Sequence, residues 1–209
     1  PSLLPENLIA DEKHTRHNSE KVYVATTVAQ GCILGSGLAE NAGTDALTEG
    51  YRDFQEEARE LDPGYQPETV NTDGWEPTQK AWTRLFPTVV IILCFFHSFL
   101  KIRDRCRRSR EILRAVGEKV WNAYHSDTLA QFSQRIRRLR EWAQNLTPDP
   151  VREKVLDLCE KASRFKTAFS VPDAYRTSNM LDRLMNYQDR VLYAMQYFHG
   201  THTSTLSYL

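Results

Sequence analysis

The first hundred residues alternate between strand-like and helix-like stretches, and this order restricts the fold more than any other feature of the sequence. Strands are predicted at the short apolar run 8–10, over 21–29, which is rich in β-branched and aromatic residues, and at 32–34. The polar segment 13–20 and the pair Gln30-Gly31 are predicted to be the turns between them. These three strands would form an antiparallel meander.

Two helices and two further strands follow in alternation. Apolar residues recur every three or four positions over 44–61, which predicts an amphipathic helix that ends before Pro63-Gly64. A short strand over 68–72 and a helix over 76–86 come next, and the continuous apolar run 89–96 is typical of a strand buried on both faces. The order β-β-β-α-β-α-β predicts an α/β fold with a mixed five-stranded sheet and flanking helices.

The charges divide unequally along the chain, although 27 basic and 27 acidic residues cancel overall. Residues 1–100 carry 7 basic and 15 acidic side chains, whereas residues 101–209 carry 20 basic and 12 acidic ones. In the second half, helices are predicted at about 111–124, 129–145 (capped by Asp127), 151–168 and 178–198. Basic clusters lie at 101–110 and 135–140. Two such clusters favour contact with phosphates, although a solvated helical face has the same composition.

Several classes of protein are excluded by what the sequence lacks. The longest apolar run, 89–96, is far short of the roughly 20 residues of a membrane helix, and no secretory signal opens the chain. Four cysteines without paired spacing favour a reduced, cytosolic compartment. No phosphate-binding glycine loop, GxSxG or HExxH motif is present, which excludes P-loop NTPases, α/β-hydrolases and zincins. The first residue is not Met, so we expect a fragment of a longer protein.

Three carboxylates are candidates for a metal site. Asp11 and Asp73 each follow a predicted strand, and ligands collect beyond strand ends in such sheets. Asp182 lies on the last predicted helix, at an edge that could face the sheet. Mg²⁺ prefers oxygen ligands, and two such ions roughly 3.5–4 Å apart can activate water and stabilise a leaving oxygen on a phosphate. The alternative is that Asp11 and Asp73 are turn residues and Asp182 is a solvated helix acid.

Two other groups contain metal-binding residue types. Cys94 and His97 end the apolar run, but a zinc site there would need ligands that no nearby residue obviously supplies. A buried Cys beside a hydrogen-bonded His is the interpretation we prefer. Glu12, His14 and His17 lie in the predicted polar turn, where we expect them at the surface.

Four short motifs in a fixed order resemble the catalytic domain of DDE-type DNA transposases, closest to mutator-like and related bacterial insertion-sequence enzymes. In that family the first two motifs end strands with catalytic acids, the third is a Cys-x-x-His element, and the fourth is a helix with the third acid. The motifs are Leu8-Ile9-Ala10-Asp11-Glu12, Val70-Asn71-Thr72-Asp73-Gly74-Trp75, Cys94-Phe95-Phe96-His97 and Arg176-Thr177-Ser178-Asn179-Met180-Leu181-Asp182-Arg183.

The resemblance implies a ribonuclease-H-like fold interrupted by an all-helical insertion. Residues 1–100 would form the first part of the catalytic core, 101–175 the insertion, and 176–209 the returning core helix and the C-terminal tail. The DNA-end-binding domain of the family would lie N-terminal to this chain.

The resemblance also implies a chemistry. Asp11, Asp73 and Asp182 would be catalytic and would bind two Mg²⁺ ions, with Mn²⁺ as a substitute. The reaction would cleave transposon-end DNA and transfer the freed 3′-OH into target DNA. These relatives usually carry Glu at the third position, so the shorter Asp182 must bring its helix closer, and Asp189 is the alternative third acid.

Double-stranded DNA of transposon ends and target is the implied partner, bound by a homo-oligomer in a cytoplasmic, nucleoid-associated complex without membrane contact. Cys94, His97 and Asn179 would be accessory to the acids. The basic residues expected to contact DNA are Lys101, Arg103, Arg105, Arg107, Arg108, Arg110, Arg135, Arg138 and Arg176. Two other functions stay open: a catalytically inactive, transposase-derived DNA-binding protein, and a ribonuclease-H-like nuclease without strand transfer.

Overall fold

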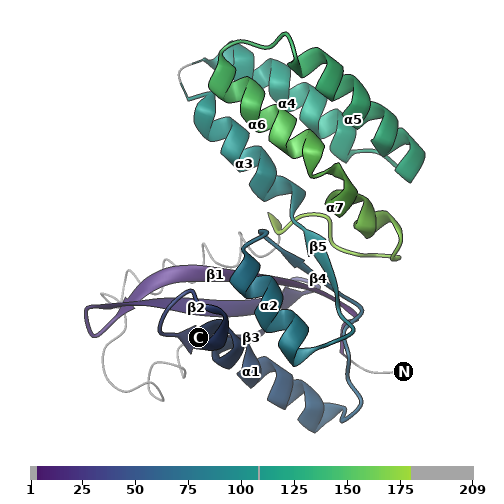
Figure 1. Ribbon diagram of the computed structural model, residues 1–209. Helices are drawn as coiled ribbons and strands as arrows, with labels where there is room; N and C mark the ends of the chain where they lie inside the picture. The colour runs from purple at the N-terminus through teal and green to yellow at the C-terminus, as the bar shows by residue number, and fades with distance from the viewer. Residues whose placement is uncertain (1–3, 108, 180–209) are drawn as a thin grey trace. The chain divides into compact units, whose positions relative to one another are not determined.

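A computed structural model describes residues 4–107 and 109–179, and they form an α/β protein (Figure 1). The chain divides into two compact units. Unit 1 comprises Pro1–Ile91 with Asp173–Leu209, and unit 2 comprises Ile92–Pro172. The charge pattern and the resemblance predicted divisions after residues 100 and 175.

The described residues contain one mixed sheet of five strands in the order β3-β2-β1-β4-β5. β1 pairs antiparallel with β2 and parallel with β4, and β2 pairs antiparallel with β3. The predicted order β-β-β-α-β-α-β and the mixed five-stranded sheet are confirmed. The strands are β1 (Asn7–His17), β2 (Glu20–Ala29), β3 (Cys32–Ala39), β4 (Thr69–Thr72) and β5 (Val90–Leu93).

The first hairpin is longer than predicted. β1 continues to His17, and its ladder with β2 ends at the pair of His17 with Glu20. Asn18 and Ser19 form the turn with φ angles of 47° and 69°, the positive values that a two-residue hairpin turn requires. The predicted turn over 13–20 is therefore wrong, because polar residues of this stretch pair with β2. In consequence Asp11 lies within β1 rather than at its end.

Two helices cover one face of the sheet, as Figure 1 shows. α1 (Thr44–Leu61) and α2 (Glu76–Leu85) have the predicted bounds within one residue. Their buried aromatic residues pack together: the rings of Trp82 and Phe86 stack 5.5 Å apart, and Tyr51 lies 5.2 Å from Trp82. The core of unit 1 therefore lies between this helix pair and the sheet.

The predicted strand over 89–96 is wrong in its second half. β5 ends at Leu93, Cys94 is the N-cap of the next helix, and α3 (Phe95–Arg105) begins directly after it. A short apolar run does not distinguish a buried strand from a buried helix by periodicity. Phe95 and Ile102 are seven positions apart, and both are buried in the core of unit 2. The burial of this stripe gives the segment its helical form.

Unit 2 is helical beyond the end of β5. The helices predicted around 111–124 and 129–145 are confirmed, whereas the one predicted over 151–168 is interrupted at Lys161. The N-cap of α5 is Thr128 and not Asp127, because the Thr128 hydroxyl accepts a hydrogen bond from the backbone N–H of Gln131. The elements are α4 (Arg110–Tyr124), α5 (Leu129–Ala143), α6 (Asp149–Glu160), α7 (Ala162–Lys166) and the 3-10 helix η1 (Thr167–Phe169).

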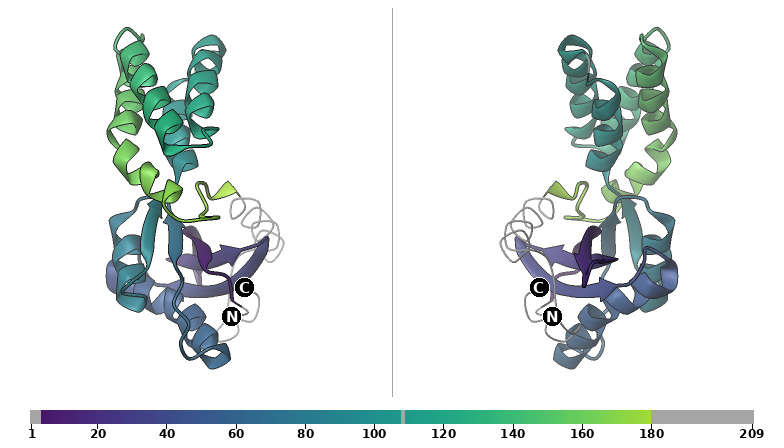
Figure 2. Two further views of the ribbon diagram at one scale, coloured as in Figure 1. Left: turned by 90° about the vertical axis from the view of Figure 1, so that its right-hand side faces the viewer. Right: turned by 90° about the vertical axis from the view of Figure 1, so that its left-hand side faces the viewer.

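Helices α4, α5 and α6 lie side by side in both views of Figure 2. Their buried residues, Phe132 among them, form the core of unit 2. No helix in the described part of the chain has both the length and the apolar character to span a membrane. The helix predicted at about 178–198 lies almost entirely outside the described residues.

The packing of α1 on β3 depends on a close approach at Gly37. A Cβ atom at this position would lie 2.1 Å from the backbone oxygen of Gly50 in α1. Such a contact forces the backbone of one of the two elements to move. Gly37 is therefore required for the contact between this helix and the edge of the sheet.

We predict that Gly37→Ala lowers the free energy of unfolding by about 1–3 kcal/mol, the usual range for overpacking a buried site. Urea denaturation followed by tryptophan fluorescence measures it. Gly64→Ala is the matched control, because a Cβ there meets no atom closer than 3.5 Å. Equal stability of the two variants would contradict the proposed role of Gly37.

Candidate active site

The parallel pairing of β1 with β4 brings two of the predicted acids to neighbouring positions. Leu8 pairs with Val70, and Ile9 pairs with Asn71. When this register is continued by two residues, Asp73, just past the end of β4, is level with Asp11 in β1. Side chains alternate along a strand and neighbouring strands lie about 4.8 Å apart. The two carboxylates therefore start from adjacent positions on the face of the sheet opposite to α1 and α2.

A backbone hydrogen bond orients each of these carboxylates. Oδ1 of Asp73 accepts from the backbone N–H of Trp75 at 2.7 Å, across a turn in which Gly74 has a φ of 95°. Oδ1 of Asp11 accepts from the backbone N–H of Glu12 at 2.9 Å. Trp75 itself is held by a hydrogen bond from its indole N–H to the carbonyl oxygen of Ala42 at 3.1 Å. Both acids thus have defined local geometry.

Glu12 lies on the opposite face from Asp11, between the sheet and the two helices. Its Oε1 accepts hydrogen bonds from the Tyr51 hydroxyl at 2.6 Å and from the Thr78 hydroxyl at 2.8 Å. Burial raises the pKa of Glu12 to about 7, and the charges of Asp11 and Asp73 act in the same direction. Glu12 is therefore near enough to Asp11 and Asp73 for their charges to act on it, although burial is the main cause of the shift in its pKa.

The surface position predicted for Glu12 is wrong, and the residues that hold it were not recognised. The signal was present in the alternation of Leu8, Ala10 and Glu12, which places a carboxyl group in line with two core residues. Burial also raises the pKa of Tyr51 well above its usual value, so the phenol stays protonated and donates to Glu12.

The segment that precedes Asp182 is anchored on the same face as Asp11. The side-chain N–H of Asn71 donates to the carbonyl oxygen of Tyr175 at 2.8 Å, and the Tyr175 hydroxyl accepts from the backbone N–H of Gln30 at 2.9 Å. The Tyr175 ring packs on Ile9 and Val28. The chain therefore reaches the sheet at the level of Ile9 and Asn71, two residues before the acids. The sequence did not indicate a role for Asn71 or Tyr175, because their contact joins segments that are far apart along the chain.

The third acid lies outside the described residues, as does the alternative, Asp189. Within residues 4–107 and 109–179, no group of three or more His, Cys, Asp and Glu side chains is arranged to hold a metal ion. Asp11 and Asp73 could therefore supply only part of a metal's ligands. Asn179, the last described residue, is exposed.

The remaining candidate metal-binding residues lie along β1 and at the start of α3. Cys94 is buried at the start of α3, and His97 lies partly buried in the first turn of that helix, both in unit 2. His14 is exposed and lies 5.8 Å from the ring of Tyr23. His17 is buried at the end of β1, six positions after Asp11, so the surface position predicted for it is wrong.

The basic residues expected to contact DNA lie mostly at the surface. Arg103 and Arg107 both form ion pairs with Asp104, while Arg135 is half-buried. Arg176 is half-buried beside Tyr175, and Arg108 lies outside the described residues. The other expected residues are all exposed: Lys101, Arg105, Arg110 and Arg138.

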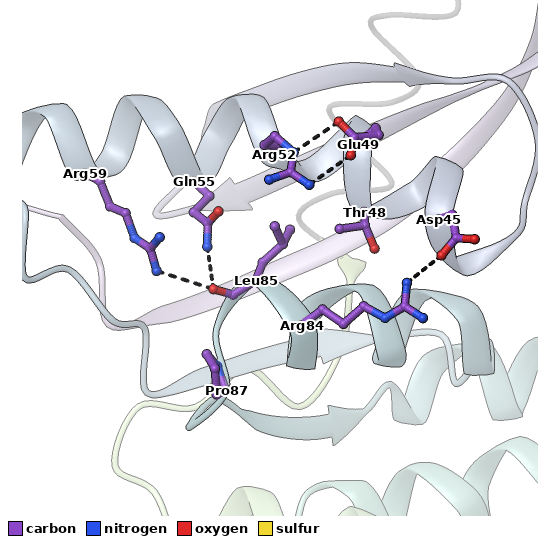
Figure 3. Close-up of a pocket in the computed structure, with 9 residues that line it drawn as sticks. All are labelled: Asp45, Thr48, Glu49, Arg52, Gln55, Arg59, Arg84, Leu85 and Pro87. Atoms are coloured by element: carbon purple, nitrogen blue, oxygen red, sulfur yellow. Dashed lines mark hydrogen bonds and ion pairs between the residues drawn. The ribbon is translucent and has the colours of Figure 1, made fainter.

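A hollow of about 610 Å³ lies between α1 and α2 (Figure 3). It contains three arginines whose charges are already engaged. Arg52 pairs with Glu49, Arg84 pairs with Asp45, and Arg59 donates to the Leu85 carbonyl oxygen at 3.4 Å. Gln55 donates to the same carbonyl. The hollow is thus a hydrogen-bonded junction between the two helices and does not favour an anion.

The chain matches no protein-family model, and no curated protein sequence resembles it significantly. A functional proposal therefore depends on the geometry around Asp11 and Asp73. The features that carry it are the register of β1 with β4 and the anchoring of Tyr175.

We predict that Glu12 makes the protein less stable as the pH rises from about 4.5 to about 7. In this window the folded state keeps a proton on Glu12 that the unfolded state has released. The stabilising effect is complete below pH 4.5 and is lost as the pH passes 7, by at most about 3 kcal/mol. Glu12→Gln, which resembles the protonated form, should flatten this dependence in urea denaturation between pH 5 and 8 with a chelator present.

Glu57→Gln is the matched control, since it removes an exposed carboxyl group of α1. This variant should keep the wild-type pH dependence. A Glu12→Gln protein with the same pH dependence as the wild type would show that Glu12 is already ionised in the folded state.

Proposed function

We propose that this chain is the catalytic domain of a DDE-type DNA transposase, which cleaves transposon-end DNA and transfers the 3′-OH end into target DNA. The observation that carries the proposal is the level position of Asp11 and Asp73 on the parallel neighbours β1 and β4. Two carboxylates level with each other on adjacent strands form the type of site that binds hard cations beside a phosphate. The anchored segment before Asp182 supports the proposal, because it approaches the same face.

The fold is compatible with this proposal. The order β3-β2-β1-β4-β5, with β2 antiparallel to both of its neighbours, is compatible with a ribonuclease-H-like sheet. Unit 2 begins within β5, and the chain rejoins unit 1 at Asp173. We propose that this helical unit is an insertion into a ribonuclease-H-like core.

The residues present fit a divalent cation such as Mg²⁺ or Mn²⁺ in their chemistry. Asp11 and Asp73 supply carboxylate oxygens, which are the ligands that such cations prefer. Asp182 is proposed as the further ligand. When bound, two such ions would supply Lewis-acid polarisation of a phosphodiester and an activated water.

The chain's own residues would position this chemistry. The backbone N–H groups of Glu12 and Trp75 orient the two carboxylates. Glu12 ties β1 to both covering helices through Tyr51 and Thr78, which limits movement of the strand that carries Asp11. Such support from rigid elements is what a precise site needs.

The other proposed roles concern DNA and the accessory residues. Exposed basic residues of α3, together with Arg110, Arg135, Arg138 and Arg176, would bind phosphates of double-stranded DNA without reading its sequence. Cys94, His97 and Asn179 are proposed as accessory to the acids. The active form would be a homo-oligomer on paired DNA ends.

The decisive test compares Asp11→Asn and Asp73→Asn with the wild-type chain. We expect wild-type protein to bind Mn²⁺ in calorimetric titration and to cut transposon-end DNA when joined to its end-binding domain. Either substitution should reduce cutting by at least about a hundredfold and weaken Mn²⁺ binding, because the cation loses a carboxylate. Asp45→Asn is the control: it removes an exposed acid of α1, and its metal binding and cutting should equal those of the wild type.

Two other results would point to the alternative functions. If Mn²⁺ binding is absent, or does not depend on Asp11 and Asp73, the chain is an inactive, transposase-derived DNA-binding protein. If it cuts DNA but fails to join pre-cleaved 3′-OH ends to a target, it is a nuclease without strand transfer.

A further inference from the structure

A second hollow, of about 240 Å³, lies between α4 and α5 in unit 2 and has a different electrostatic character. Its lining contains three cations, one amide and one aliphatic side chain, and no acidic residue. The lining residues are Lys119, Asn122, Arg135, Arg138 and Leu139. Of these, only Arg135 and Arg138 were among the predicted DNA-binding residues.

The guanidinium group of Arg135 is held in place by the end of α4. Its Nη1 donates to the carbonyl oxygens of Asn122 at 2.7 Å and His125 at 3.1 Å, and lies 3.4 Å from the Ser126 hydroxyl. All of these contacts use one nitrogen. A guanidinium group has five N–H donors, and no described residue accepts from Nε or Nη2. Arg135 thus has a fixed position and donors that remain for a ligand.

The other two cations of this hollow have no acidic partner among the described residues. Nζ of Lys119 lies 5.0 Å from the centre of the Trp142 ring, which holds the ammonium group against an aromatic face. Arg138 is exposed. The nearby acids are engaged elsewhere: Glu118 pairs with Arg114, and Glu141 pairs with Arg137.

Three positive charges with no acidic residue in the lining favour an oxyanion. Guanidinium and ammonium donors match phosphate oxygens in charge and geometry. The hollow between α1 and α2 shows the contrast, because two of its three arginines are paired with carboxylates and the third with a carbonyl oxygen (Figure 3). An anion entering the α4–α5 hollow would displace no ion pair.

The charge of the whole unit favours a polyanion over a free phosphate. Residues 92–172 contain 17 basic and 9 acidic side chains. A surplus of this size attracts a chain of phosphates over a wide area, while a built hollow fixes one of them. We infer that Lys119, Arg135 and Arg138 form a pocket that holds one backbone phosphate of a nucleic acid. The inference rests on the proposed function for the identity of its ligand.

The test is a salt titration of duplex DNA binding by the full chain, followed by fluorescence anisotropy. In the double variant Lys119→Gln/Arg138→Gln we expect weaker binding and a slope of log K against log salt that is smaller by about 1, the loss of one phosphate contact. Arg135 is not substituted, because its hydrogen bonds hold the end of α4. Their loss would destabilise the fold, and weaker DNA binding could then not be assigned to the missing charge.

The matched control is Arg114→Gln/Arg137→Gln. It removes the same number of charges from the same two helices, but from residues already paired with Glu118 and Glu141. We expect its salt slope to equal that of the wild type. Equal slopes for the two double variants would overturn the inference, because binding would then depend on overall charge and not on the pocket.

A titration with inorganic phosphate separates the two sources of the oxyanion. Suppose that the Lys119→Gln/Arg138→Gln variant loses the binding of free phosphate but keeps the wild-type salt slope for DNA. The assignment of the pocket to a polynucleotide is then overturned. The proposed function is judged separately, from Mn²⁺ binding that depends on Asp11 and Asp73. A pocket-dependent slope without such metal binding would support the pocket and reject the transposase. Metal binding together with a salt slope that is the same in the pocket variant and the wild type would support the proposed function and reject the pocket.

Discussion

The parallel pairing of β1 with β4 is the interaction on which the candidate site depends. Parallel neighbours need a long crossover, and here β2, β3 and α1 lie between the two strands along the chain. The register of Ile9 with Asn71 then determines that Asp73 is level with Asp11. A slip by one residue would turn one carboxylate to the opposite face, because side chains alternate along a strand. Burial of Leu8 and Val70 against the helices stabilises this register.

Two consecutive residues of β1, Asp11 and Glu12, lie on opposite faces of the sheet and have different surroundings. Asp11 belongs to the face that receives Tyr175, whereas Glu12 belongs to the face covered by α1 and α2. The carboxyl group of Glu12 is buried and hydrogen-bonded, and its raised pKa reflects its burial and the nearby acids. The strand that carries the candidate acid is therefore tied to both covering helices.

The charged side chains are arranged differently in the two compact units. In unit 1 the candidate acids Asp11 and Asp73 are level with each other on the neighbouring strands β1 and β4, and the arginines between α1 and α2 are engaged. In unit 2 the pocket formed by Lys119, Arg135 and Arg138 contains positive charges without an acidic partner among the described residues. The first arrangement is of the kind that suits a cation, and the second is of the kind that suits an anion.

The sequence by itself determined the order of strands and helices from β1 to β5, the bounds of α1 and α2, and the choice of Asp11 and Asp73 as candidates. Periodicity, turn residues and motif order are local properties, so they can be seen along the chain. The tertiary structure decided that residues 13–17 are a strand, because their polar groups pair with β2, and that the apolar run after β5 becomes a helix, because unit 2 buries one stripe of it. It also decided that the carboxyl group of Glu12 lies between the sheet and the helices, since its hydrogen-bond partners come from two helices far along the chain, and no local pattern records contacts between distant segments.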